Sequence, residues 1–327
     1  MRSNHVPRVL RAPDPTLPRS ASFSWVIHDG RRIRTGTAVE LRPAFRDLLR
    51  DYRRRDFIVP YPGGSLRFGG RTLVMGVLNV TPDSFSDGGL HLDPDRAVSA
   101  GLAMEGADVL DVGGESTRPG AEPVSAAEEI RRVEPVVRGL ARRGRLVSID
   151  TAKPAVARAA FAAGARILND VTALADPDLA REAVRARVPV VLMHMKGTPR
   201  TMQRDPVYRD VVAEIADFLH ERMDRALSAG IPRARILLDP GIGFGKRPEH
   251  NLEILRRLEE LRSLGRPVVV GTSRKSFIGH VLGRPVGERR DGTAATVTAA
   301  VLRGADMVRV HDVREMADAA RMADRMK

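Results

Sequence analysis

The chain has 327 residues, 43% of them hydrophobic, which is enough to bury a large core. It contains no cysteine, which excludes disulfides, thiolate metal sites and a cysteine nucleophile. No apolar run approaches the roughly 20 residues that span a bilayer, and residues 1–15 lack the apolar stretch of a secretory signal. These features predict a cytoplasmic protein.

The net charge of +13 is concentrated at the front of the chain. Residues 1–70 hold 14 arginines and 6 acidic residues, a surplus of 8, so the rest of the chain contributes only 5. An Arg-, Ala- and Gly-rich composition also results from high-GC coding, so the charge is a weak indication of a nucleic-acid partner. A side function of residues 1–70 in nucleic-acid binding stays open, and salt-dependent binding would support it.

Residues 1–64 are expected to form a basic N-terminal extension of unknown role, partly disordered. Residues 1–20 are rich in Pro and Arg, a composition typical of disorder. Residues 23–36 predict a hairpin around Asp29-Gly30, and residues 42–56 predict a short basic helix. A second hairpin is expected around Gly69-Gly70, where it would plug the bottom of the domain that follows.

From residue 72 onward, short runs rich in Val, Ile and Leu alternate with longer segments of helical periodicity. Eight strands are expected, at residues 72–80, 109–114, 146–150, 166–171, 189–195, 236–241, 268–273 and 307–312. Helices are expected after them, for example at 125–143, 154–164, 207–229, 249–264 and 287–304. Eight βα units predict a closed (β/α)8 TIM barrel, an α/β fold, over residues 65–327. A doubly wound open sheet is the alternative.

Every expected strand has a polar residue at or near its C-terminal end. These residues are Asn79, Asp111, Asp150, Asn169, His194, Asp239, Ser273, Arg309 and His311. Helix capping would place such residues beyond the strand rather than within its apolar run. In this architecture the C-terminal ends of the strands form the active-site face.

Asp150, Asn169 and Asp239 are the deepest polar residues, and Lys275 follows the seventh strand. Buried carboxylates need ion pairs or hydrogen-bond donors. Lys275 offers one positive charge, so a structural ion pair is one interpretation. A neutral heterocycle with several N–H donors on one edge, such as an aminopyrimidinone, accounts better for the second carboxylate and the amide.

The first and last strands are neighbours in a closed barrel, so Asn79, Arg309 and His311 are expected to converge. Arg309 offers a fork for phosphate oxygens and His311 a further donor. For His311 alone, a structural histidine is the alternative interpretation. An Asn oxygen suits Mg²⁺, which prefers few protein ligands together with water and phosphate. The set therefore predicts a phosphate site with Mg²⁺.

Three glycine-rich loops complete the predicted mouth of the site. Two of them, TPDSFSDGG and GGESTRPGA, follow the first and second strands, and their glycines suit mobile lids. Phe85 is suited to cover an aromatic group, and Arg118 to reach an anionic one. The third, DPGIGFGK, places Phe244 near Asp239 and lacks the spacing of a Walker phosphate loop.

Residues 72–327 resemble the dihydropteroate synthase family of the folate pathway. The resemblance rests on eight motifs in order: NVTPDSFSDGG, DVGGESTRPGA, SIDT, ILNDV, LMHMKGTPRTMQ, LLDPGIGFGK, GTSRKSFIG and RVHDV. It implies a (β/α)8 barrel, usually a homodimer, that joins 6-hydroxymethyl-7,8-dihydropterin diphosphate to p-aminobenzoate and releases 7,8-dihydropteroate and diphosphate. Inhibition by sulfonamides is a further expectation for the family.

The resemblance also implies roles for individual residues. The pterin would be held by Asp150, Asn169, Met193, Asp239, Phe244, Gly271 and Lys275. The diphosphate would be bound by Asn79, Arg309 and His311, with Asn79 as the Mg²⁺ ligand. The p-aminobenzoate would be contacted by Phe85, Thr117, Arg118, Pro119 and Ser276. Asp87, Arg118 and Lys275 would be catalytic, as diphosphate leaves a pterin cation that the aniline nitrogen attacks.

Two other functions stay open at this point. A related barrel transfers a methyl group from methyltetrahydrofolate to a corrinoid protein, but it has no need of a diphosphate site. A catalytically silent pterin-binding paralogue should have lost residues in the lid loops or at the diphosphate end, and none is lost here. The expected partners are small molecules and a second copy of the chain, with no membrane.

Overall fold

A parallel eight-stranded sheet lies at the centre of the computed structural model, which describes residues 8–11, 24–28, 31–35, 43–81, 93–116, 122–198 and 201–327. Its strands are β6 (Leu73–Asn79), β7 (Val109–Gly113), β8 (Val147–Asp150), β9 (Ile167–Asp170), β10 (Val190–Met193), β11 (Ile236–Asp239), β12 (Val269–Val270) and β13 (Met307–Val310). They follow the order β11-β10-β9-β8-β7-β6-β13-β12. A parallel bridge between Leu238 and Val268 joins the two ends. The barrel prediction is therefore confirmed, and the open-sheet alternative is wrong.

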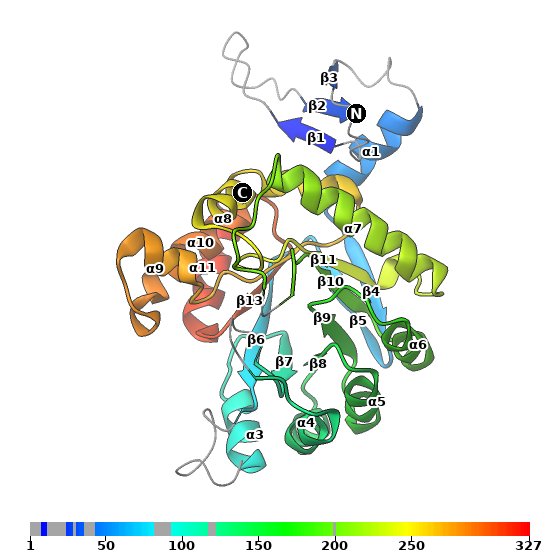
Figure 1. Cartoon of the computed structure of the whole chain (residues 1–327), viewed down its shortest axis with the longest axis vertical. Coiled ribbons are helices and arrows are strands. Elements are labelled where there is room, and N and C mark those ends of the chain that lie inside the picture. The colour runs from blue at the N-terminus through cyan, green and yellow to red at the C-terminus, as the bar shows by residue number, and fades with distance from the viewer. Residues whose placement is uncertain are drawn as a thin grey trace.

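Helices surround the strands (Figure 1). They are α3 (Pro94–Leu102), α4 (Ala126–Arg142), α5 (Pro154–Ala163), α6 (Pro177–Ala186), α7 (Val211–Ser228), α8 (Pro248–Arg256), α9 (Ser276–Leu282), α10 (Arg290–Leu302) and α11 (Val313–Arg325). Short 3-10 helices lie at η1 (Arg233–Arg235), η2 (Leu258–Leu264) and η3 (Val286–Glu288). No helix among the described residues is both long enough and apolar enough to cross a membrane.

Polar caps determine where several helices begin. Asp93, Ser125 and Asp210 each accept a hydrogen bond from a backbone N–H in the first turn of α3, α4 and α7. The helix expected at 207–229 therefore starts only at Val211. The helix expected at 249–264 is also corrected, because α8 ends at Arg256 and the chain continues as the 3-10 helix η2.

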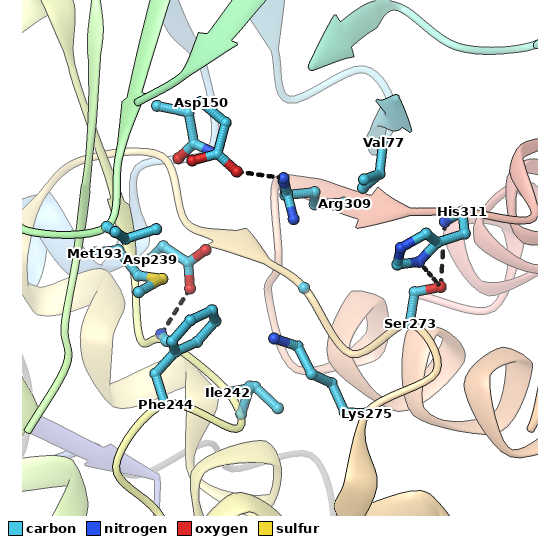
Figure 2. Close-up of a pocket in the computed structure, with 14 residues that line it drawn as sticks. Val77, Asp150, Met193, Asp239, Ile242, Phe244, Ser273, Lys275, Arg309 and His311 are labelled. Carbon is cyan, nitrogen blue, oxygen red and sulfur yellow. Dashed lines mark hydrogen bonds and ion pairs between the residues drawn. The ribbon is translucent and has the colours of Figure 1, made fainter. Parts of the chain in front are cut away.

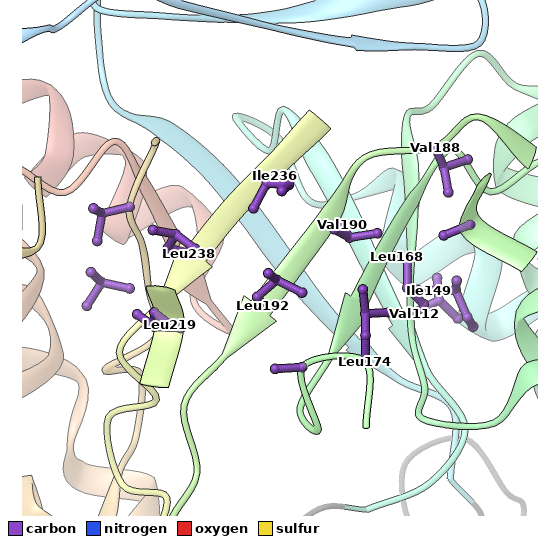
Figure 3. Close-up of a cluster of buried hydrophobic side chains, with 14 of the residues drawn as sticks. Val112, Ile149, Leu168, Leu174, Val188, Val190, Leu192, Leu219, Ile236 and Leu238 are labelled. Carbon is purple, nitrogen blue, oxygen red and sulfur yellow. The ribbon is translucent and has the colours of Figure 1, made fainter. Parts of the chain in front are cut away.

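The two-residue period of the strands divides the barrel into an outer and an inner core. Val190 and Leu192 of β10 and Leu238 of β11 point outward into a large apolar cluster beneath the helices (Figure 3). Alternate residues belong to an inner cluster at the N-terminal end of the barrel. This inner layer contains Leu73, Met75, Val109, Ile167, Val191, Leu237, Val269 and Met307.

A hairpin of β4 (Phe57–Tyr61) and β5 (Gly64–Phe68) covers the inner layer from below. Its buried side chains Phe57, Val59, Leu66 and Phe68 belong to the same cluster. The expected plug is thus present, but its turn lies at Pro62-Gly63 rather than at Gly69-Gly70. A domain boundary between residues 64 and 65 would separate the two paired strands, so the hairpin is better grouped with the barrel.

The N-terminal extension contains a small sheet and a helix. β1 (Arg8–Arg11), β2 (Ser24–His28) and β3 (Arg31–Thr35) pair antiparallel, so the hairpin expected at 23–36 is confirmed and part of residues 1–20 is a strand. The expected basic helix is α1 (Pro43–Arg53). The buried Arg262 of η2 donates to the carbonyl oxygen of Tyr52 at 3.3 Å, which ties the end of α1 to the barrel.

Candidate active site

A cavity opens one layer above the apolar inner core, at the C-terminal ends of the strands (Figure 2). Six of its 14 lining residues lie two positions beyond a member of the inner layer, because alternate residues of a strand face the same side. The lining residues are Val77, Asp150, Asn169, Val171, Met193, Asp239, Gly241, Ile242, Phe244, Gly271, Ser273, Lys275, Arg309 and His311. All seven residues assigned to pterin by the resemblance are among them.

Arg309 of β13 holds two carboxylates at the floor of this cavity. Its Nε donates to Asp111 Oδ2 and its Nη2 to Asp150 Oδ2, each at 2.7 Å. Asn169 Nδ2 donates to the same Asp111 oxygen at 2.9 Å. The Asp111 side chain is fully buried. Arg309 is therefore the ion-pair partner of Asp111 and Asp150, whereas the charge of Lys275, the alternative partner considered for the deep carboxylates, acts on Asp239.

Burial raises the pKa of two carboxyl groups in the cavity. It raises the pKa of Asp150 to about 7, although Arg309 opposes the shift, and the neighbouring Asp111 adds to it. Burial also raises the pKa of Asp239. The hydrogen bond from the Gly241 N–H and the charge of Lys275 both act in the opposite direction and lower this pKa. Near neutral pH, the floor can therefore gain or lose a proton at Asp150.

Lys275 lies on the other side of the cavity, against Phe244. Its Nζ is 4.0 Å from the centroid of the Phe244 ring, within the range of a cation–π contact. Figure 2 shows the ring between Asp239 and Lys275. A flat ligand in this space would have carboxylate and amide acceptors at one edge and a cation at the other.

His311 and Ser273 stand at the end of the cavity nearest β13. Ser273 Oγ accepts the His311 backbone N–H at 3.1 Å and lies 3.0 Å from His311 Nδ1. Burial lowers the pKa of His311 to about 4, helped by the positive charge of Arg309. The imidazole is therefore neutral at pH 7. With the Ser273 hydroxyl donating to Nδ1, the Nε2–H is the donor that remains for a ligand.

Asn79 and Ser276 do not line the cavity. Asn79 is half-buried at the end of β6, two residues beyond Val77, and Ser276 is exposed at the start of α9. The neighbouring positions of β6 and β13 are confirmed, since Arg309 pairs with Met75. The expected convergence of Asn79 with Arg309 and His311 is thus met only for Arg309 of β13 and for His311, which directly follows β13.

The described residues include no group of three or more His, Asp or Glu side chains that could hold a metal ion. Asn79 fits a different arrangement, in which one protein oxygen is completed by phosphate and water. Its side chain makes no hydrogen bond to another described residue, so its oxygen is available. A Mg²⁺ ion carried by a diphosphate is therefore compatible with Asn79.

Five residues of the predicted site lie outside the described part of the chain: Phe85, Asp87, Thr117, Arg118 and Pro119. The described flanks are Thr81, Asp93, Ser116 and Glu122. β6 ends at Asn79 and β7 at Gly113, shortly before these two stretches of the sequence.

Sequence reasoning missed Asp111 and Ser273 as parts of the site. Both are polar residues at predicted strand ends, but the sequence alone assigns neither of them to a ligand or to a partner side chain. The register contains a usable signal for Asp111, because it lies two residues after Val109 of the inner layer, as Asp239 lies two residues after Leu237. Ser273 had no comparable signal, since its partner His311 follows a different strand, β13.

Comparison with known proteins places this site in a family. The profile of the pterin binding enzyme family matches residues 75–311. The dihydropteroate synthase of Escherichia coli strain K12 is 47% identical over 254 residues, which cover 77% of this chain and 90% of that protein.

Solved structures give the same result. A Xanthomonas albilineans dihydropteroate synthase with 4-aminobenzoic acid superposes with a TM-score of 0.78 at 47% identity, covering 83% of this chain and 98% of that one. A structure from the same organism with 7,8-dihydropteroate has a TM-score of 0.71 at 46% identity, with 78% and 94% covered.

Proposed function

Because the chain belongs to the pterin binding enzyme family and, within it, to the dihydropteroate synthases, we propose that it makes 7,8-dihydropteroate in the cavity above the barrel. The substrates are 6-hydroxymethyl-7,8-dihydropterin diphosphate and p-aminobenzoate, and diphosphate is the second product. The observation that carries the proposal is the lining of one cavity by Asp150, Asn169 and Asp239 together with Arg309 and His311.

The pterin is bound by its N–H edge to the carboxylate and amide side chains. An aminopyrimidinone presents several donors on one side, and Asp150, Asn169 and Asp239 present acceptors within one cavity. Phe244 covers the ring, and Lys275 lies within reach of its acceptor edge. Desolvated carboxylates are costly unless donors meet them, so the ligand's donors compensate for part of that cost.

The reaction begins with loss of diphosphate. The bond between the pterin methylene carbon and the diphosphate oxygen breaks, and its electron pair leaves with the diphosphate. Arg309 Nη1, which makes no hydrogen bond to another described residue, and the Nε2–H of neutral His311 stabilise the charge that develops on the leaving group. A Mg²⁺ ion held by Asn79 would neutralise further charge on the diphosphate when bound.

The new bond forms between the same methylene carbon and the aniline nitrogen. That nitrogen supplies its lone pair and then loses a proton to solvent or diphosphate. We assign the p-aminobenzoate side of the site to Ser276, at the exposed start of α9, together with Phe85, Thr117, Arg118 and Pro119. Asp87, Arg118 and Lys275 stay predicted catalytic residues.

The direct test is diphosphate release by purified protein given the pterin diphosphate and Mg²⁺, with and without p-aminobenzoate, with dihydropteroate measured in parallel. We expect dihydropteroate only when all three components are present. Tight pterin binding with neither diphosphate release nor dihydropteroate would contradict the proposal and favour a silent pterin-binding protein.

A homodimer is the proposed assembly. Three apolar side chains in and after α9 are solvent-exposed: Val281 by 55%, Leu282 by 49% and Val286 by 54%. Such a patch is typical of a contact surface. Light scattering should give twice the mass of the chain, and a Val281→Glu, Leu282→Glu double variant should shift it toward the monomer. The cytoplasmic location stays a prediction from the sequence.

A further inference from the structure

We propose that Lys246 is a positioning residue for pterin binding. Its side chain holds two cavity-lining residues of the loop after β11, Gly241 and Phe244, against His194, which follows β10. The loop runs from Asp239 to Lys246 and contains Gly241 and Phe244, which line the cavity. The inference rests on the proposed pterin site, and it concerns a residue that does not line the cavity itself.

Lys246 Nζ makes four polar contacts in an enclosed place, and the longest, at 3.4 Å, is to the carbonyl oxygen of His194. Its Nζ donates to the carbonyl oxygens of Gly241 at 2.8 Å and Phe244 at 2.9 Å, and it lies 2.9 Å from His194 Nδ1. Only 3% of Lys246 and 4% of His194 is exposed. Burial lowers the pKa of both side chains, and none of the hydrogen bonds of Lys246 within the described chain is made to a carboxylate. An enclosed lysine without a bonded carboxylate is costly.

The shape of the loop explains why it needs such a donor. Gly241, Gly243 and Gly245 have φ angles of 66°, 82° and 62°, a left-handed conformation that favours glycine. A side chain at Gly241 would overlap the carbonyl oxygen of His194, so the loop backbone lies directly against the chain that follows β10. Carbonyl groups enclosed in this way require donors.

Within this loop, the carbonyl groups of residues that line the cavity and those of residues that do not are bonded by different side chains. Gln203 Nε2 donates to Gly243 at 2.8 Å, and Tyr208 Oη donates to Gly245 at 2.7 Å. Neither of these glycines lines the cavity. Lys246 bonds Gly241 and Phe244, which do line it. Tyr208 is therefore a matched control for Lys246.

The contacts of Lys246 affect two groups that line the cavity, the Asp239 carboxylate and the Phe244 ring. The Gly241 N–H donates to Asp239 Oδ1 at 2.6 Å, so fixing Gly241 also fixes the carboxylate that receives the pterin. Fixing Phe244 keeps its ring at 4.0 Å from Lys275 Nζ. Without Lys246, the Phe244 carbonyl would lose its donor, and the Gly241 carbonyl would keep only the Phe244 N–H at 3.0 Å, so the loop would move to restore the lost hydrogen bonds.

The test compares Lys246→Met with Tyr208→Phe in the full-length protein. We expect Lys246→Met to raise the KM for the pterin diphosphate at least tenfold while the KM for p-aminobenzoate changes less than threefold. Tyr208→Phe should lower the thermal midpoint but leave both KM values within twofold. The dissociation constant of the pterin diphosphate, measured by calorimetry without p-aminobenzoate, should rise in parallel with its KM in Lys246→Met.

A folded Lys246→Met protein with unchanged pterin KM and dissociation constant would overturn the inference. If Lys246→Met does not fold, His194→Leu removes the contact of Lys246 with the imidazole after β10 and keeps only the one with the His194 carbonyl, and we expect at least a threefold rise in the pterin dissociation constant. Loss of folding in both variants would assign Lys246 to stability alone and would also overturn it. Failure of the proposed function differs from these results, because the wild-type protein would then release no diphosphate.

Discussion

Arg309 joins two carboxylates that would otherwise repel each other at the floor of the cavity. Asp111 is completely buried and binds both Arg309 and Asn169, so it fixes the guanidinium from below. Asp150 is bonded to the same guanidinium but also lines the cavity. Arg309 thereby connects a purely structural acid with one that is able to bind ligand.

The raised pKa of Asp150 predicts a pH dependence of pterin binding. With a pKa of about 7, Asp150 becomes protonated as the pH falls below neutrality, and a protonated carboxyl accepts pterin N–H groups poorly. The KM for the pterin diphosphate should therefore be constant above about pH 8 and rise below pH 7. Initial rates from pH 5.5 to 9 would measure it, and Asp150→Asn should give a high KM with a flattened profile.

The same pKa shift has a defined effect on stability. The folded-state pKa of Asp150 lies above its ordinary value of 3.8, so the folded state binds this proton more tightly than the unfolded state does. Its contribution to the free energy of unfolding is therefore fully present below about pH 4 and is lost as the pH rises through 7. Asp150→Asn should remove this component from the pH dependence of urea unfolding.

Lys275→Ala and Arg309→Ala should both impair turnover but differ in stability. We expect each to lower kcat/KM at least tenfold, or about 1.4 kcal/mol of transition-state stabilisation. Arg309→Ala should also lower the free energy of unfolding by about 3 kcal/mol, because it leaves the buried Asp111 unpaired. Near-normal rates in both variants would refute the site assignment, and equal stabilities would refute the structural role of Arg309.

The sequence was informative for residues whose role follows from one strand and less so for pairs across strands. Asp150, Asn169 and Asp239 follow apolar runs, so their place in the cavity was predictable. The ion pair of Arg309 with Asp111 joins residues 198 positions apart in sequence, and only the closed barrel brings them together. Lys246 had no signal, since its partners are mainly backbone carbonyl groups.

Among the secondary-structure elements, α5 is directly preceded by a lysine that joins several segments. Lys153, before α5, donates to Glu129 of α4 at 2.6 Å and to Glu115 after β7 at 2.9 Å. It also donates to the carbonyl oxygen of Val124 at 2.6 Å. Glu115 and Val124 lie on opposite sides of the segment that contains Thr117 to Pro119, so Lys153 ties together the two described ends of that segment.

Replacement of Lys153 should therefore destabilise the fold. Lys153→Met leaves the Glu129 carboxylate, which is 1% exposed, without its ion pair, and we expect a loss of about 3 kcal/mol in the free energy of unfolding. Urea unfolding monitored by circular dichroism would measure it. Arg131→Met, which removes an exposed ion pair on α4, is the control and should leave the free energy of unfolding nearly unchanged.

All eight strands were predictable because near-continuous apolar runs are typical of strands buried on both faces. The turn of the plug was not, because Gly69-Gly70 and Pro62-Gly63 are equally good turn signals. Pairing decides between them: Phe57 is opposite Phe68 in the hairpin, which buries Phe57 and Val59 on the same side as Leu66 and Phe68. That choice depends on the apolar layer of the barrel above, which the local sequence does not contain.

For the whole molecule, two truncations should have opposite effects. Removal of residues 1–42 keeps α1, whose end is bonded to Arg262, and should leave kcat within twofold of wild type. Removal of residues 1–68 also deletes the hairpin and exposes the inner apolar layer to water, so we expect aggregation or loss of cooperative unfolding. Gel filtration and thermal unfolding of both proteins would show the contrast. A folded, active product of the longer deletion would contradict the role of the hairpin.

The pairing between β11 and β12 is the shortest between neighbouring strands of the barrel. β12 has only two residues, and the bridge from Leu238 to Val268 is what joins it to β11. Local openings start where few backbone hydrogen bonds must break. In amide hydrogen exchange, residues 268–272 should therefore lose protection before β6 to β10 do. Because Gly271, Ser273 and Lys275 directly follow this strand, the cation side of the cavity would fluctuate more than its carboxylate floor, and a bound pterin should slow exchange there.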